Sequence, residues 1–300
     1  MPLTRTIDRP RRYSVRRSAA AFTVTLALVA VLTFDHTAAT VHAAQPLGSF
    51  GLNDGLPLTV AHRGDPAAAP ENTLPAFEAA LRSGAQVLEL DLQATADGHA
   101  VLFHDDLLDR TTNGTGPIAE RTLDELQALD AGSWYGSAWA GTSIPTFSEF
   151  LPLLQSSTAR ALIEFKGIWS PDELRPVVAA IYRAGVQDRV VLASFESPTL
   201  LDLWREAPSL PRAVVVRRLS DDPVAFAAEH GASTVVTSLR SFQVEPDAAE
   251  RLRAAGLTII VYTLNRADLW QQAVDLGVDG VVTDAPRRLA QVQAAARSGS

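Results

Sequence analysis

Strand-like and helix-like runs alternate along most of this 300-residue chain, and this alternation limits the available folds more than any other feature. Regular alternation predicts a parallel sheet with helical connections. About eight such units predict an α/β chain folded as a closed (β/α)8 TIM barrel, with an open doubly wound sheet as the alternative. The expected barrel strands are 58–61, 85–92, 160–165, 189–194, 213–216, 234–237, 258–263 and 279–282.

Helical spacing of apolar residues follows the expected strands. The expected helices are 73–83, 146–155, 171–184, 197–206, 223–230, 247–255, 267–275 and 286–296. Residues 105–145 depart from the pattern, because they are polar, rich in Gly, Thr and Asp, and helical only near 123–129. A long excursion of this kind usually carries function or covers a site. We therefore expect an insertion after the second strand region, which ends in an additional extended run at 100–103.

The N-terminus has the order of a secretory signal. Six arginines precede an uncharged, mostly apolar stretch from Ser18 to Phe34, and small residues follow up to Ala44. That stretch is marginal for a membrane span, which needs about 20 apolar residues, so an uncleaved anchor is the less favoured alternative. We expect a signal peptide at 1–44, a lead-in at 45–57, a barrel at 58–296, and a secreted mature protein without a stable membrane span.

Charge and cysteine content exclude several classes of function. Removal of residues 1–44 takes away six arginines and two aspartates, so the net charge changes from −8 to −12. A surface this acidic argues against nucleic acid as a partner. The chain has no cysteine, which excludes disulfides, thiolate metal sites and cysteine nucleophiles.

Two carboxylates stand two residues apart within an apolar run that we expect to be a strand, at Glu89 and Asp91. Alternate residues of a strand point to the same face, so both carboxylates lie on one face. Two carboxylates placed in this way can hold one hard cation together. The spacing therefore favours a cation site on this strand.

Histidines, an arginine and a second charged pair stand near the ends of neighbouring apolar runs. His62 and His104 can transfer protons to and from a reacting group, and Arg63 suits a phosphate. Glu164 and Lys166 again share one strand face, and Lys166 is the only lysine in the chain. The carboxyl ends of barrel strands meet at one mouth, so these groups are expected to converge there.

Each of these features also has a structural interpretation. A His-Arg pair in a strand–loop corner is often an ion pair, spaced carboxylates can bond arginines, and Glu164 and Lys166 can neutralise each other. The joint pattern is harder to explain by packing, because it places so many charged groups at one mouth of a largely apolar chain. Taken together, the residues favour a functional site.

The chain resembles the glycerophosphodiester phosphodiesterases through short motifs that run in the family's order across about 58–290. The motifs are His62-Arg63-Gly64, Pro70-Glu71-Asn72-Thr73, Glu89-Leu90-Asp91, His104-Asp105, Asp109-Arg110-Thr111-Thr112-Asn113-Gly114, Ile144-Pro145-Thr146, Glu164-Phe165-Lys166 and Gly277-Val278-Asp279-Gly280-Val281-Val282-Thr283-Asp284-Ala285-Pro286. Each motif is common by itself, whereas the combination is highly specific.

The resemblance implies metal-dependent hydrolysis of a small glycerophosphodiester to sn-glycerol 3-phosphate and an alcohol. It implies three groups of site residues: an acid–base pair of His62 and His104, phosphate-binding Arg63 and Lys166, and the ligands Glu89, Asp91 and Glu164 for one divalent cation, Ca²⁺ or Mg²⁺. Glu71 would support the site or lie beside the metal, and 105–145 would shape the pocket.

Tyr262 is a departure from the family pattern, which often has tryptophan at this seventh-strand position. Tyr262 and Phe195 are candidates for an apolar wall of the pocket, or for ordinary packing at the barrel mouth. Three rival functions remain: the same site acting on lysophospholipids or cell-wall glycerophosphate polymers, a non-catalytic ligand-binding barrel, and a carboxylate-pair glycosidase. A glycosidase has no use for Arg63, Lys166 and two histidines around a metal.

Overall fold

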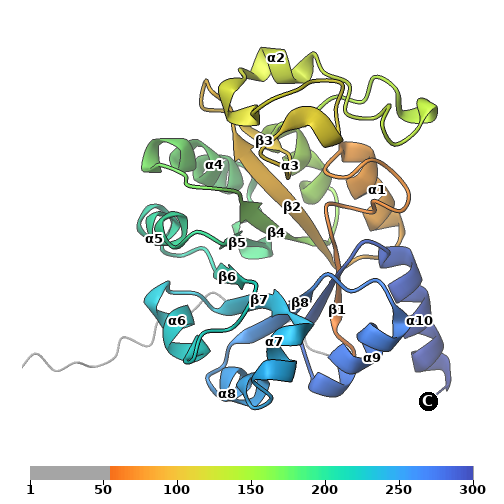
Figure 1. Ribbon diagram of the computed structural model, residues 1–300, viewed down its shortest axis with the longest axis vertical. Helices are drawn as coiled ribbons and strands as arrows, with labels where there is room; N and C mark the ends of the chain where they lie inside the picture. Colours follow the sequence, from red (N-terminus) through yellow and green to blue (C-terminus); the bar gives the residue numbers. More distant parts are fainter. Residues whose placement is uncertain (1–54, 300) are drawn as a thin grey trace, which may run out of the picture. The chain divides into compact units, whose positions relative to one another are not determined.

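Eight parallel strands close into a ring in the computed structural model, which describes residues 55–299. The ring closes because β1 pairs with both β9 and β2. This confirms the (β/α)8 barrel and excludes the open sheet (Figure 1). The barrel strands are β1 (Leu58–Ala61), β2 (Val87–Ala94), β4 (Arg160–Phe165), β5 (Val190–Ser194), β6 (Arg212–Val216), β7 (Thr234–Ser238), β8 (Thr258–Tyr262) and β9 (Gly280–Thr283).

Helices surround this ring, and all eight expected helices are present. Two have the expected ends, five differ by one residue at one or both ends, and the last extends three residues further. They are α1 (Leu74–Arg82), α3 (Phe147–Gln155), α4 (Pro171–Ala184), α5 (Ser197–Glu206), α6 (Pro223–Glu229), α8 (Ala248–Ala254), α9 (Ala267–Leu276) and α10 (Pro286–Gly299). The short helix α7 (Leu239–Val244) was not expected, because its six residues hold too little periodicity to mark a helix. Within 55–299, no helix has the length and apolarity that a membrane crossing needs.

The extended run at 100–103 forms a strand outside the ring. Strand β3 (Ala100–Leu102) lies antiparallel to β2, with Leu102 opposite Leu92. This hairpin returns the chain to the carboxyl end of β2, where the Phe103 backbone N–H donates to the Asp91 carbonyl at 3.0 Å. His104 therefore reaches the barrel mouth from a hairpin instead of from a barrel strand.

The insertion follows this hairpin and has a small core of its own. It contains α2 (Leu123–Gln127), which is shorter than the helical piece expected near 123–129, and three short 3₁₀ turns. Its core is formed by Leu108, Ile118, Leu126, Ala131 and Ile144 of the insertion, together with Val101 and Phe103 from the preceding hairpin. The insertion occupies the upper part of Figure 1, beside the mouth-side ends of β2 and β3. Because it packs as a unit, it can present a defined surface to the pocket.

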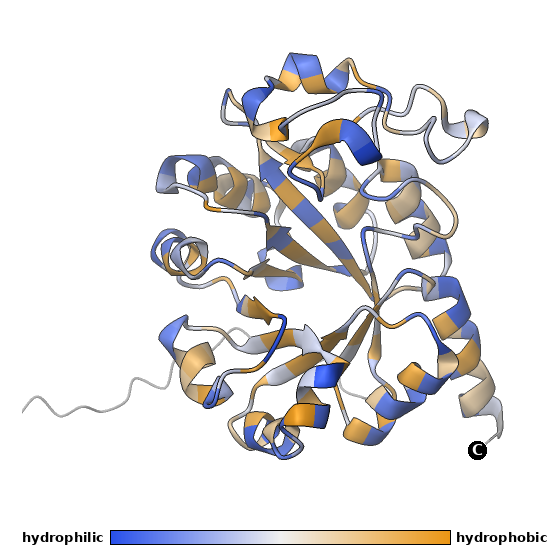
Figure 2. Cartoon of the chain, in the orientation of Figure 1, coloured by the Kyte–Doolittle hydropathy of each residue, from blue (hydrophilic) through white to orange (hydrophobic). Residues whose placement is uncertain are grey.

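Successive residues of β2 face the barrel interior and the surrounding helices in turn. Val87 packs inside the barrel, and Glu89, two residues later, points to the same face of the strand. Leu88, Leu90 and Leu92 pack outward against the helices. Figure 2 shows this alternation as blue and orange bands along β2. Because side chains alternate between the two faces, β2 can pack apolar residues against the helices and carry charged residues on its inner face.

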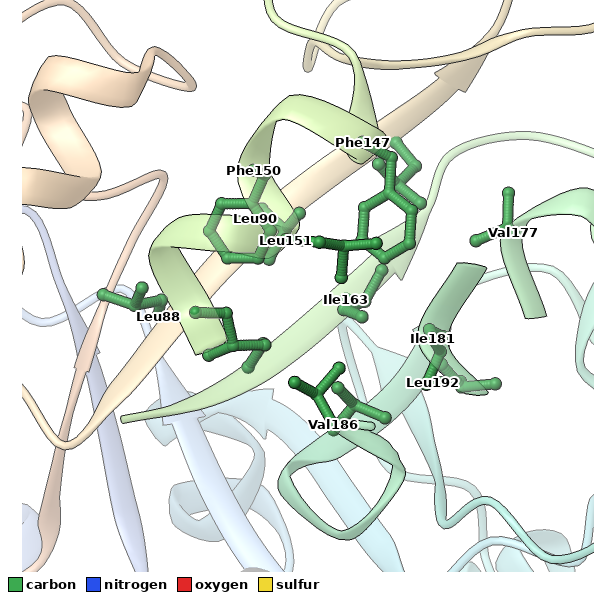
Figure 3. Packing of buried hydrophobic residues seen from close by; sticks show 14 of the residues in the cluster. Leu88, Leu90, Phe147, Phe150, Leu151, Ile163, Val177, Ile181, Val186 and Leu192 are labelled. Atoms are coloured by element: carbon green, nitrogen blue, oxygen red, sulfur yellow. The ribbon is translucent and has the colours of Figure 1, made fainter. Parts of the chain in front are cut away.

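The outer layer is expected to contribute strongly to stability. Phe150 is fully buried beside Phe147 (Figure 3). Its ring centroid lies 6.3 Å from that of Phe147 and 5.0 Å from that of Phe77. We expect Phe150→Ala to lower the free energy of unfolding by about 3–5 kcal/mol, measured by urea denaturation. Val292→Ala, at a half-exposed position on α10, should change it by less than about 0.5 kcal/mol. Equal effects of the two substitutions would contradict this packing.

Candidate active site

A pocket of about 850 Å³ opens at the carboxyl ends of the barrel strands. Nine of the ten residues expected at the site line it, and Glu71 lies behind them. The nine are His62, Arg63, Glu89, Asp91, His104, Glu164, Lys166, Phe195 and Tyr262. Residues of the insertion, including Leu107 and Arg110, complete the rim. Residues that are up to 200 positions apart in the sequence therefore share one cavity.

On each barrel strand, the alternate side chains that point into the barrel are followed at the carboxyl end by side chains that line the pocket. On β4, Leu162 packs inside the barrel, and Glu164 and Lys166 follow at the same parity. On β6, Val215 packs inside the barrel and Arg217 follows. The same rule holds on the other strands that supply site residues, because side chains of a strand alternate between its faces. The floor of the pocket is therefore apolar and its mouth is charged.

Three carboxylates meet at the centre of this pocket. Asp91 and Glu164 are direct partners in the β2–β4 register, and Glu89 lies two residues earlier on β2. One oxygen from each lies within 4.8 Å of the others. Burial raises the pKa of Glu89 and of Glu164, and the nearby Asp91 carboxylate raises both further. Three buried oxygen donors that repel one another fit a hard divalent cation, which would relieve that repulsion.

Two cationic side chains border the carboxylates. The Arg63 Nε lies 3.2 Å from Asp91, and the Lys166 Nζ donates to Glu164 at 2.7 Å and lies 3.7 Å from Asp91. Burial alone would lower the pKa of Lys166, but Asp91 and Glu164 raise it above its ordinary value. Both cations thus remain charged beside the carboxylates, which is the environment that an anionic phosphate requires.

Glu71 belongs to an arginine network instead of to the carboxylate group. Its carboxylate accepts from Arg63 at 2.7 Å and from both terminal nitrogens of Arg110 at 2.7 and 2.8 Å. Burial would raise the pKa of Glu71, but the Arg110 and Arg63 contacts lower it. Glu71 was expected either to support the site or to lie beside the metal. Its contacts favour the supporting role.

The backbone at the start of the site adopts a conformation that is uncommon for residues with side chains. Arg63 and Asn72 both have φ of +55°, and the Asn72 N–H donates to the Arg63 carbonyl at 3.0 Å. The Arg63 N–H donates to Glu89 at 2.8 Å, and the Asn72 side chain donates to Asp91 at 2.9 Å. This local strain is held by bonds to two of the central carboxylates, a pattern common at functional sites.

Each pocket histidine has an aspartate on its Nδ1. His62 contacts Asp284 at 2.6 Å, and His104 contacts Asp105 at 2.5 Å. Burial would lower the pKa of His62, but the Asp284 hydrogen bond and the Glu89 charge raise it. Burial lowers the pKa of His104, and the raising effect of Asp91 does not offset it. In both rings Nε2 is therefore the nitrogen left for other partners.

An aromatic pair forms one wall of the pocket. The Phe195 and Tyr262 rings meet edge to face, with centroids 6.3 Å apart. The Tyr262 hydroxyl donates to the Val216 carbonyl at 3.0 Å, and burial raises the pKa of Tyr262 to about 12. The hydroxyl that distinguishes this residue from tryptophan is thus bonded to the end of β6.

Known proteins share this architecture. A model of the glycerophosphoryl diester phosphodiesterase family matches residues 62–288. The chain belongs to this family. A glycerophosphodiester phosphodiesterase from Caldanaerobacter subterraneus subsp. tengcongensis is 34% identical over 234 residues, which cover 77% of this chain and 96% of that protein. A putative glycerophosphodiester phosphodiesterase of Bacillus subtilis, YhdW, is 35% identical over 234 residues, which cover 76% of this chain and 94% of that protein.

Solved structures of the glycerophosphodiester phosphodiesterase family match the whole barrel. The enzyme from Agrobacterium tumefaciens has a TM-score of 0.70 at 32% identity and covers 79% of this chain and 100% of its own. An Oleispira antarctica phosphodiesterase, solved in complex with the product sn-glycerol-3-phosphate, has a TM-score of 0.76 at 28% identity and covers 82% of this chain and 98% of its own. The chain is thus an enzyme of the phosphoric diester hydrolase class.

Several residues of this glycerophosphodiester phosphodiesterase received no individual role from the sequence, although Asn72, Arg110 and Asp284 lie in the motifs that carry the family resemblance. Asn72 holds Asp91, Asp284 holds His62, Arg110 holds Glu71 and Asp105, and Arg217 lines the pocket. The period of two along β6 would have indicated Arg217. Asp284 likewise continues the inward alternation of Val282 on β9, whereas Asn72 and Arg110 lie outside the barrel strands, where no local pattern marks their roles.

Proposed function

We propose that the chain hydrolyses glycerophosphodiesters to sn-glycerol 3-phosphate and an alcohol, with one divalent cation and two histidines. One observation carries the proposal: three carboxylate oxygens within 4.8 Å of one another lie beside Arg63 and Lys166 in a single pocket. This arrangement suits a phosphodiester, because negative charge accumulates on its oxygens during attack at phosphorus.

Glu89, Asp91 and Glu164 would hold the cation, which is Ca²⁺ or Mg²⁺ because all three ligands are hard oxygens. Such a cation would offset charge on the phosphate oxygens. Arg63 and Lys166 would bind the same phosphate as hydrogen-bond donors. Glu71 would keep the Arg63 guanidinium in place through the 2.7 Å contact between them.

His62 and His104 would transfer the protons. One imidazole accepts a proton from the attacking oxygen, and the other donates a proton to the leaving alkoxide. Asp284 and Asp105 orient the two rings through Nδ1, so Nε2 is the atom that exchanges each proton. Fixing each ring in one orientation lowers the cost of reaching the reactive geometry.

The direct test is release of glycerol 3-phosphate from glycerophosphocholine by the protein from residue 45 onward. Chelation should lower the rate by more than about 10²-fold, and adding Ca²⁺ or Mg²⁺ should restore it, because the carboxylates alone repel an anionic substrate. Undiminished release in excess chelator would remove the metal from the proposal. No release with either metal would reject the small diester as substrate and leave lysophospholipids and glycerophosphate polymers to be tested.

Asp284→Asn tests the orienting role of the carboxylate on His62. We expect kcat to fall about 10- to 100-fold with a smaller change in KM, because the imidazole stays in place but loses its charged partner. The pH dependence of kcat should shift as well. Asp268→Asn, at an exposed aspartate that pairs with Arg266, is the matched control. An unchanged kcat and pH profile for Asp284→Asn would show that His62 does not depend on this contact.

We also propose that the enzyme is exported. The support is the order of basic, apolar and small residues in 1–44, which lie outside the residues that the structure describes. Expression of the full chain in a bacterial host should release a product whose N-terminus lies near residue 44, as read by N-terminal sequencing of protein from the medium. Retention of the intact chain in the cytoplasm would reject export.

A further inference from the structure

Arg217 is a pocket residue that the proposed reaction does not use. It directly follows β6 and continues the inward parity of Ala213 and Val215, which pack inside the barrel. Its side chain lines the same pocket as the reacting groups. Its position is therefore set by the strand, as are those of Lys166 and Tyr262.

The Arg217 guanidinium lies along the aromatic wall. Its central carbon is 5.4 Å from the Phe195 ring centroid, and the Lys166 Nζ is 5.7 Å from the same centroid. The two cations are therefore no further apart than the sum of these distances. The end of β6 is anchored by the bond from the Tyr262 hydroxyl to the Val216 carbonyl. The Arg217 guanidinium thus contacts the same aromatic ring as Lys166, which borders the proposed phosphate position.

Arg217 also differs from the other pocket cations in its charge balance. Arg63, Arg110 and Lys166 each have a carboxylate oxygen at 2.7 Å. Among residues 55–299, no carboxylate forms an ion pair with Arg217, although Glu196 lines the same pocket. The Arg217 side chain is exposed and lines the pocket, so its N–H donors are accessible to a ligand there.

We propose that Arg217 determines specificity by binding an anionic group on the leaving alcohol of the substrate. The inference rests on the proposed function, which places the scissile phosphate beside Lys166. The glycerol part of the diester carries only hydroxyls, so only the alcohol can bring a second negative charge. A carboxylate or a phosphate a few bonds beyond the scissile phosphate is within reach of the guanidinium, which binds either group through paired donors.

The acidic residues of the pocket give the opposite expectation. Asp106, Asp109 and Glu196 line the pocket and would favour an alcohol with a cationic group. Asp109, however, accepts from the Gly116 N–H at 3.0 Å, so part of its acceptor capacity is used within the insertion. Arg217 would raise kcat/KM for the more anionic of two otherwise identical substrates, whereas the acidic residues would lower it. A comparison of such substrates therefore distinguishes the two effects.

Two matched substrate pairs test the inference with the purified protein. Glycerophosphoserine differs from glycerophosphoethanolamine by one carboxylate, and glycerophosphoinositol 4-phosphate differs from glycerophosphoinositol by one phosphate. In each pair kcat/KM is measured for the unaltered enzyme, Arg217→Gln, Arg217→Lys and the control Arg218→Gln. Arg218 is exposed and does not line the pocket, so its substitution removes the same charge from the adjacent position.

We expect Arg217→Gln to lower kcat/KM for the anionic member of a pair by about fivefold to tenfold, and to leave the other member within about twofold. Arg217→Lys should retain part of the preference, and Arg218→Gln should retain all of it. A response in only one pair would identify the anion as carboxylate or phosphate. Added salt should weaken the preference, because the contact is exposed.

Three results would overturn the inference. The first is a ratio of kcat/KM values within both pairs that is the same for Arg217→Gln as for the unaltered enzyme, and the second is an equal loss of kcat/KM for both members of each pair. The third is a higher kcat/KM of the unaltered enzyme for the less anionic member. Each of these leaves the proposed function standing, since the substrates are still hydrolysed. Failure of the unaltered enzyme to hydrolyse any of the four diesters or glycerophosphocholine would instead reject the proposed function, and the inference with it.

Discussion

His104→Ala is expected to lower kcat for glycerophosphodiester hydrolysis by about 10²–10⁴-fold, because it removes one of the two groups that we propose as the proton-transfer pair. KM should change much less, since Arg63, Lys166 and the cation that the carboxylates would hold remain available to bind the phosphate. The measurement is steady-state release of glycerol 3-phosphate at saturating divalent cation. The side chain is partly exposed, so little stability should be lost, and the thermal unfolding midpoint checks this.

The chain supplies a matched control for this substitution. His99 lies on the turn between β2 and β3, is exposed, and contacts Asp97 at 3.4 Å. His99→Ala should leave kcat within about twofold, because an exposed pair of this kind contributes little. A loss of less than tenfold in His104→Ala, with His99→Ala unchanged, would mean that another group performs the proton transfer.

Asp91→Asn is expected to abolish cation binding and to lower activity by more than about 10²–10³-fold. Asp91 is the central member of the carboxylate group, since it is the register partner of Glu164 and contacts Arg63 and Lys166. Asparagine keeps the shape but removes the charge that holds a divalent cation. Calorimetric titration with Ca²⁺ and Mg²⁺ measures the loss of binding directly, without any dependence on turnover.

A thermal shift provides a second readout of the cation site. Cation at 100 times its Kd should stabilise the unaltered protein by about 2.7 kcal/mol, and this stabilisation should vanish in Asp91→Asn. Glu196→Gln is the matched control, because Glu196 lines the same pocket outside the group of Glu89, Asp91 and Glu164. Cation binding by Asp91→Asn with unchanged affinity would show that the carboxylate group is not the metal site.

The fold was largely predictable because its signal is local. Each barrel strand is a short apolar run and each long helix has its own amphipathic period, so the count of units led to the closed barrel. Two elements behaved differently. The run at 100–103 is extended, as expected, but lies outside the ring, and α7 is too short to carry a period. The pairing of a strand with its neighbours, and the formation of a very short helix, depend on contacts with residues that are distant in sequence.

The candidate residues were predictable for a similar reason. Pairs such as Glu89 and Asp91, or Glu164 and Lys166, share a face through the two-residue period of a strand. Their convergence follows from the parallel barrel, which places all carboxyl ends at one mouth. The supporting residues followed this rule only in part. Asp284 directly follows β9 and continues the inward alternation of Val282 to meet His62, whereas Asn72 meets Asp91 through a left-handed backbone turn.

The sequence by itself determined the barrel, the family and the set of reactive side chain types, because periodicity and motif order are properties of the chain alone. Only the tertiary structure decided how those side chains are paired. It placed Glu71 with arginines instead of with Glu89, Asp91 and Glu164, gave each histidine its aspartate, and left Arg217 without an ion pair among the described residues. Hydrogen bonds and ion pairs act over a few ångströms, so distances between elements, which no local pattern encodes, decide which charges are neutralised and which remain to bind a substrate.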